Sequence, residues 1–107
     1  MGTLQERIVK LYKQAATSLP QDVEDALRRS AKAEKDGSAS KTALSAILEN
    51  IRIARKTERP LCQDTGVPVF FVKVPRKLSQ LDIQNTIIRA TRIATEEVPL
   101  RPNAVDI

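Results

Sequence analysis

The chain reads PLCQDTG at Pro60–Gly66, and the apolar run VPVFFV follows at once at Val67–Val72. Four successive positions carry a thiol, an amide, a carboxylate and a hydroxyl, and the glycine after them permits a tight backbone turn. A run of valines and phenylalanines is typical of a buried strand. We therefore predict a polar turn held by an apolar strand, and loops held in this way often carry binding residues.

Four helices are expected around this turn, because apolar residues recur on both sides of it at helical spacing. The predicted helices cover about residues 3–17, 21–35, 40–56 and 79–97. Thr3 with Glu6, and Ser79 with Asp82, have the spacing of helix N-terminal caps. The elements on either side of the motif turn are thus predicted to be helical.

The strand is expected over Val67–Val74, with Pro68 placing its first residues at an edge or on a loop. The predicted fold class is therefore α+β, predominantly helical with one strand. A lone strand needs a partner for its backbone groups, which could come from later sequence, from another chain or from the segment Pro99–Ile107. For this reason we expect residues 1–107 to be a fragment of a larger α/β domain.

The charge pattern argues against a nucleic-acid partner. A net charge of +5 would attract a polyanion, but the basic residues are interspersed with acidic ones. Only Tyr12, Phe70 and Phe71 could stack on bases. The basic residues are therefore predicted to lie on solvated helix faces.

A cytoplasmic location without a membrane partner is expected. The N-terminal residues Met1–Lys13 lack the continuous apolar core of a secretory signal. No run in the sequence approaches the roughly 20 apolar residues that span a bilayer.

Cys62 is the only cysteine, and the chain contains no histidine. A Cys–His nucleophile, a zinc site with four ligands and an iron–sulfur cluster held by this chain alone are therefore excluded within these residues. Any metal site that includes Cys62 must be completed elsewhere. In isolation, a cysteine is most often a small buried hydrophobic residue.

The neighbouring polar residues also have two interpretations. Asp64 either binds a ligand or organises its own turn through an Asx hydrogen bond, and the two roles are compatible. Arg101 is a surface arginine by default, but its planar guanidinium is also suited to bidentate binding of a carboxylate.

Three segments carry a resemblance to a known family, namely LPQDV at Leu19–Val23, ILENI at Ile47–Ile51 and CQDTG at Cys62–Gly66. With them, the chain resembles the N-terminal part of class I (iron–sulfur) fumarate hydratases and of L-tartrate dehydratase alpha subunits. The similarity runs along nearly the whole chain, as far as LRPNAVD at Leu100–Asp106. The pentapeptide is its specific part.

The resemblance implies a hydro-lyase that reversibly hydrates a four-carbon dicarboxylate, either fumarate/malate or tartrate/oxaloacetate. In this family the motif cysteine is one of three that hold a [4Fe–4S] cluster, and Cys62 matches it. Gln63 and Asp64 match residues that contact the substrate, and Arg101 is similar to a substrate-binding arginine. The fourth iron of the family's cluster keeps a coordination site open for substrate, and this iron acts as a Lewis acid on substrate oxygens.

The remaining parts of such an enzyme are expected outside residues 1–107. The resemblance places the catalytic base in a C-terminal domain or a beta subunit, and the full enzyme is expected to be an oligomer. No catalytic residue is expected within this chain, which alone should be inactive. The alternative function is a noncatalytic helical interaction domain with a structural cysteine, and a third is a small basic nucleic-acid binder.

Overall fold

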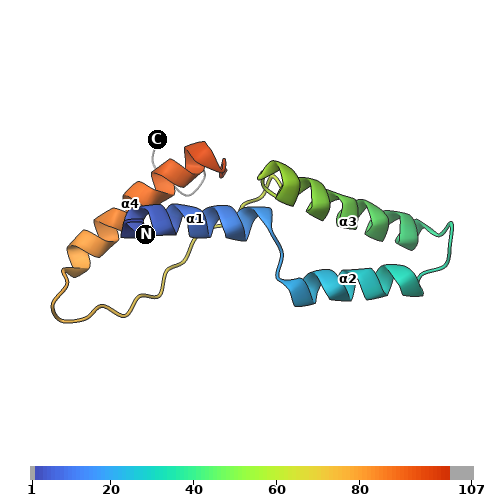
Figure 1. The fold of residues 1–107 in the computed structure, drawn as a ribbon, viewed down its shortest axis with the longest axis horizontal. Helices are drawn as coiled ribbons and strands as arrows, with labels where there is room; N and C mark the ends of the chain where they lie inside the picture. Colours follow the sequence, from blue (N-terminus) through green and yellow to red (C-terminus); the bar gives the residue numbers. More distant parts are fainter. Residues whose placement is uncertain (1, 102–107) are drawn as a thin grey trace.

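The computed structural model describes residues 2–101, which form four helices joined by loops (Figure 1). The helices are α1 (Leu4–Thr17), α2 (Gln21–Ala33), α3 (Ala39–Thr57) and α4 (Gln80–Glu97). In space α1 packs against α4, and α2 packs against α3. The two helix pairs lie end to end in a molecule with extents of 58 × 29 × 24 Å.

Side-chain caps fix the starts of three helices. The Thr3 hydroxyl accepts a hydrogen bond from the Glu6 N–H at 3.2 Å, and the Glu6 carboxylate accepts one from the Thr3 N–H at 3.1 Å. The Ser79 hydroxyl accepts from the Asp82 N–H at 3.2 Å, and Ser38 caps α3 in the same way. The caps predicted at Thr3 and Ser79 are confirmed, and they satisfy N–H groups that a helix start leaves unpaired.

The segment predicted as a strand, Val67–Val74, forms an open loop, so the predicted α+β fold is wrong for residues 2–101 (Figure 1). Its backbone makes no hydrogen bond to the backbone of any other described residue. A valine-rich sequence favours extended geometry, but a strand also needs a second strand at hydrogen-bonding distance. Pro68 within the segment and Pro75 after it also lack an N–H donor. The only regular secondary structure in residues 2–101 is therefore α-helix.

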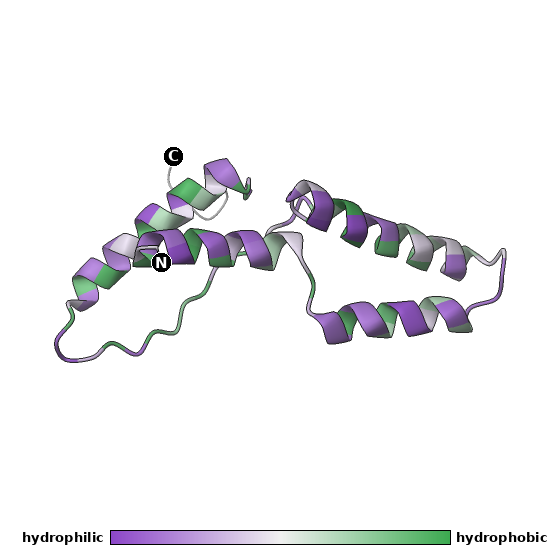
Figure 2. Ribbon diagram, viewed as in Figure 1, coloured by the Kyte–Doolittle hydropathy of each residue, from purple (hydrophilic) through white to green (hydrophobic). Residues whose placement is uncertain are grey.

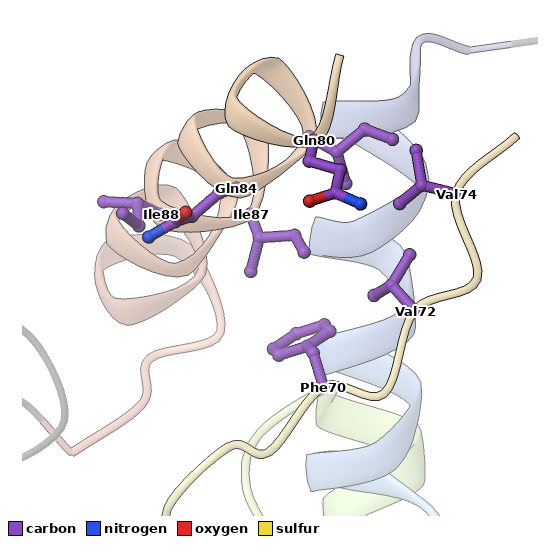
Figure 3. Close-up of a pocket in the computed structure, with 8 residues that line it drawn as sticks. Phe70, Val72, Val74, Gln80, Gln84, Ile87 and Ile88 are labelled. Atoms are coloured by element: carbon purple, nitrogen blue, oxygen red, sulfur yellow. The ribbon is translucent and has the colours of Figure 1, made fainter. Parts of the chain in front are cut away.

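Side chains of this loop nevertheless lie against the helices. The Phe70 ring meets the Tyr12 ring of α1 edge-on, with 5.9 Å between the ring centroids. Val72 and Ile87 of α4 line opposite sides of an apolar groove, as Figure 3 shows. Phe71, between the two inward residues, is 96% exposed. The loop therefore keeps the alternating side-chain pattern of a half-buried strand without a backbone partner.

The apolar core is small and is divided between the two helix pairs. Ile8, Ala90, Ala94 and Val98 are buried in the α1–α4 region, and Ala31, Ile51 and Ala54 in the α2–α3 pair. Most of these side chains are alanines, which allow close packing but bury little apolar surface. Hydrophobic residues occur along all four helices and along the open loop (Figure 2).

A buried carboxylate joins α2 to α3. Glu24 is only 3% exposed, and its two oxygens accept hydrogen bonds from Arg28 at 2.6 Å and from Arg55 at 2.7 Å. The hydrogen bond from Arg55, followed by that from Arg28, lowers the pKa of Glu24 below its ordinary value of 4.5. The carboxylate is therefore ionised at neutral pH and links the two helices.

No helix within residues 2–101 is both long enough and apolar enough to cross a membrane. Of the segment Pro99–Ile107, considered above as a possible partner of the strand, everything beyond Arg101 lies outside the described residues.

Candidate functional site

The motif turn Pro60–Gly66 begins where α1 and α3 both end. The Leu61 N–H donates to the carbonyl oxygen of Ala16 at the end of α1, at 2.9 Å. The side-chain amide of Asn50, on α3, donates to the Leu61 carbonyl oxygen at 2.8 Å. The backbone that leads into Cys62 is thus held by two helices from different pairs.

The end of α3 fixes the residue before the motif. Glu58 ends the helix in the left-handed conformation, with φ 55° and ψ 42°, and the Arg59 N–H bonds back to the Ala54 carbonyl at 3.1 Å. The Glu58 carboxylate also pairs with Lys13 of α1 at 3.1 Å. Arg59 is therefore placed by a helix terminus that is itself tied to α1.

Within the motif, Asp64 bonds to its own turn. Its Oδ1 accepts a hydrogen bond from the Gly66 N–H at 3.0 Å, and Gly66 has a φ of 73°, which glycine adopts without strain. The Cys62 sulfur accepts from the Asp64 N–H at 3.5 Å. The Asx turn considered from the sequence is therefore present, and Cys62 is exposed instead of being a buried hydrophobic residue.

Thr65 connects the motif to the segment after α4. Its hydroxyl oxygen accepts a hydrogen bond from the Arg101 N–H at 2.9 Å, across 36 positions of sequence. This contact depends on the packing of α4 against α1, because the segment that carries Arg101 directly follows α4.

These contacts create a pocket of about 550 Å³ at the motif. Its lining residues are Arg59, Pro60, Cys62, Gln63, Thr65, Pro99, Leu100 and Arg101. Three of the four residues predicted for the site, Cys62, Gln63 and Arg101, lie together on this pocket, whereas Asp64 is not among its lining residues.

The sequence interpretation missed Arg59 and gave no separate role to Thr65, and both residues also line the pocket. The signal for both was their position, since Arg59 stands directly before Pro60 and Thr65 lies inside the motif. The residues that line the pocket thus include two arginines, a cysteine, a glutamine and a threonine. Donors of this kind bind small anions, and arginine does so with two parallel hydrogen bonds to one carboxylate.

A metal ion has no complete site in the described part of the chain. No group of three or more histidine, cysteine, aspartate or glutamate side chains lies close enough together among residues 2–101 to hold one. Cys62 therefore offers a single soft donor among the residues that line the pocket.

Comparison with known proteins supports the family indicated by the motif. Residues 5–107 match the family described as "Fumarate hydratase (Fumerase)". The chain is 46% identical over 101 residues to "Putative L(+)-tartrate dehydratase subunit alpha" of Methanocaldococcus jannaschii, with 92% of this chain and 35% of that protein covered.

Two further relatives agree with this match. The chain is 40% identical over 106 residues to "Putative fumarate hydratase class I" of Geobacillus stearothermophilus, with 99% of this chain and 21% of that protein covered. It is 36% identical over 108 residues to "L(+)-tartrate dehydratase subunit alpha" of Escherichia coli K12, with 100% of this chain and 35% of that protein covered. The chain therefore spans 21–35% of the length of these relatives.

Proposed function

Because the chain belongs to the fumarate hydratase (Fumerase) family, we propose that it is the N-terminal portion of a class I hydro-lyase acting on a four-carbon dicarboxylate. The observation that carries this proposal is the pocket at the motif. There, Cys62 and Gln63 lie beside Arg101, which comes from a segment after α4. Fumarate/malate and tartrate/oxaloacetate are the candidate substrate pairs.

Cys62 is proposed to be one of three cysteine ligands of a [4Fe–4S] cluster. Its thiol is exposed at the pocket, its sulfur accepts a hydrogen bond from the Asp64 N–H at 3.5 Å, and cysteine sulfur is the usual ligand of such clusters. The residues present fit one corner of such a cluster, and the other cysteines would come from the rest of the protein. When bound, the cluster supplies a Lewis-acidic iron for substrate oxygens.

The substrate is proposed to bind through Arg101, Gln63 and Asp64. The Arg101 guanidinium can hold a carboxylate with two hydrogen bonds, and the Gln63 amide can donate a further one. Asp64 holds the shape of the turn through Gly66, and its exposed carboxylate is proposed to contact the substrate as well. Thr65 positions the Arg101 backbone by accepting its N–H.

The base that moves the carbon-bound proton is proposed to lie in a beta subunit or a C-terminal domain. Two of the relatives are named as alpha subunits, and the part of each that matches this chain is 35% of its length. We propose a cytoplasmic, oligomeric enzyme to which this chain contributes one cluster ligand and part of the substrate site.

The test uses the complete alpha-type chain together with its beta-type partner, prepared without oxygen. We expect the unmodified enzyme to show iron–sulfur absorbance and to hydrate fumarate or dehydrate tartrate. Cys62→Ala should lose both the absorbance and the turnover while its helical circular dichroism is unchanged, because the cluster loses a ligand that no neighbouring side chain can replace. Ser30→Ala, at an exposed position of α2, is the matched control and should keep both. A Cys62→Ala enzyme that retains its cluster and turnover would contradict the proposal.

A further inference from the structure

Two arginines line the pocket from separate parts of the chain. Arg59 follows α3 directly, and Arg101 lies in the segment after α4. No acidic side chain within residues 2–101 is among the lining residues. The acidic residue beside Arg59 in sequence, Glu58, is paired with Lys13. The lining side chains therefore carry two positive charges, against one negative charge on Asp64, which lies between two lining residues in the sequence, and this balance favours an anionic ligand.

Arg59 differs from an ordinary solvated arginine in how its backbone is held. Its N–H bonds to Ala54 of α3, Pro60 follows with a fixed φ, and the Leu61 N–H bonds to Ala16 of α1. The backbone is thus fixed directly before and after this residue. A side chain held at a fixed point loses less conformational freedom when it binds a ligand.

We propose that Arg59 is a second carboxylate-binding residue of this site, so that Arg101 binds one carboxylate of the substrate and Arg59 binds the other. This inference rests on the proposed function, and it explains why a pocket for a four-carbon dicarboxylate carries two guanidinium groups. The planar guanidinium suits each carboxylate, because it can donate two parallel hydrogen bonds.

The experiment compares Arg59→Gln, Arg59→Lys and Arg29→Gln in the complete enzyme with its beta-type partner. Arg29, an exposed arginine of α2 that does not line the pocket, is the matched control. The readouts are KM, kcat and inhibition by two probes of equal length, succinate with two carboxylates and butyrate with one. Cluster absorbance and circular dichroism are recorded for each variant to show that it is folded and loaded.

Arg59→Gln should raise KM and the succinate inhibition constant by about tenfold or more, because a charge-assisted hydrogen bond is lost. Its kcat should change less, and butyrate inhibition should stay within about twofold, because Arg101 alone can bind a single carboxylate. Arg59→Lys should have a KM and a succinate inhibition constant between those of Arg59→Gln and the unmodified enzyme. Arg29→Gln should behave as the unmodified enzyme.

Two results would overturn the proposed role of Arg59 and leave the proposed function standing. One is wild-type KM and succinate inhibition in Arg59→Gln. The other is an equal loss of succinate and butyrate inhibition, which would indicate a general effect of charge. If the unmodified enzyme is inhibited by neither succinate nor any other dicarboxylate, the proposed function fails together with this inference.

Discussion

At the residue scale, Glu24 is the one charged side chain that is buried within residues 2–101. It is matched by Arg28 from its own helix and Arg55 from the facing one. A buried charge with both partners in place is tolerated, but removal of one partner leaves the other desolvated. The α2–α3 pair therefore depends on this carboxylate being ionised.

We expect this dependence to appear as acid sensitivity. The pKa of Glu24 in the folded protein lies below its ordinary value of 4.5, so its ion pairs stabilise the fold above that pH. The contribution is lost progressively as the pH falls below 4.5 and through the folded pKa. Thermal unfolding, followed by circular dichroism, should show that Glu24→Gln lowers the midpoint near neutral pH and has a smaller effect near about pH 3.

Glu49→Gln is the matched control for this prediction. Glu49 also pairs with an arginine, Arg52, which lowers the pKa of Glu49, but the pair is exposed and lies within one helix. Exposed ion pairs contribute little, so this variant should shift the midpoint by a smaller amount at every pH. Equal pH profiles for the two variants would rule out a special role of the buried pair.

Three of the four residues proposed for the site from the sequence line one pocket. The motif itself pointed to Cys62 and Gln63, and the resemblance pointed to Arg101, all of which line the pocket. The contact of Thr65 with the Arg101 backbone could not be predicted from the sequence, because the two residues are 36 positions apart and meet through the packing of α1 against α4. For Asp64, local turn chemistry correctly indicated the hydrogen bond to Gly66.

At the element scale, the helices were predictable and the strand was not. Capping residues and apolar periodicity are local signals, and the four helices begin and end within two residues of the predicted bounds. A strand is not a local structure, because its hydrogen bonds are made by a second segment. The run Val67–Val74 has the composition of a strand, but no described residue pairs with its backbone.

This open loop should be the first part of the free 107-residue chain that trypsin cleaves. Lys73, Arg76 and Lys77 are exposed on a backbone without ladder hydrogen bonds, apart from the turn in which the Leu78 N–H bonds to Pro75. Proteases cut open backbone faster than helical backbone. Mass spectrometry of early fragments should place the first cut between residues 73 and 78.

Exposed basic residues of α2, such as Arg29 and Lys32, serve as internal controls for accessibility. They are also exposed to solvent, but their backbone is helical. Cleavage after these residues as early as in the loop would contradict the assignment of the loop as the least protected element.

At the scale of the whole molecule, the two helix pairs do not close into one compact body. The chain exposes 8341 Å², whereas a compact monomer of its mass exposes about 5,900 Å². Its radius of gyration is 17.5 Å, against about 13 Å for a compact domain of this length. The excess surface and the divided, alanine-rich core fit the proposal that residues 1–107 belong to a larger protein.

The free 107-residue chain should therefore unfold with weak cooperativity. Its unfolded form exposes about 17,300 Å², so unfolding exposes roughly four-fifths of the area that a compact protein of this mass would expose. Because the denaturant slope follows that area, the urea m-value should be about a fifth lower than for such a protein. A steep transition with the m-value of a compact domain would contradict the elongated arrangement.

The pairing of α1 with α4 also sets an order of events during synthesis. The Tyr12 hydroxyl bonds to Thr91, 79 positions later, while α2 and α3 are neighbours in sequence. On the ribosome the α2–α3 hairpin can form as soon as it emerges, because its contacts are local. Helix α1, in contrast, can pack only after α4 has been synthesised. The pocket, whose lining includes Arg101 beyond α4, is then among the last features of the nascent chain to be assembled.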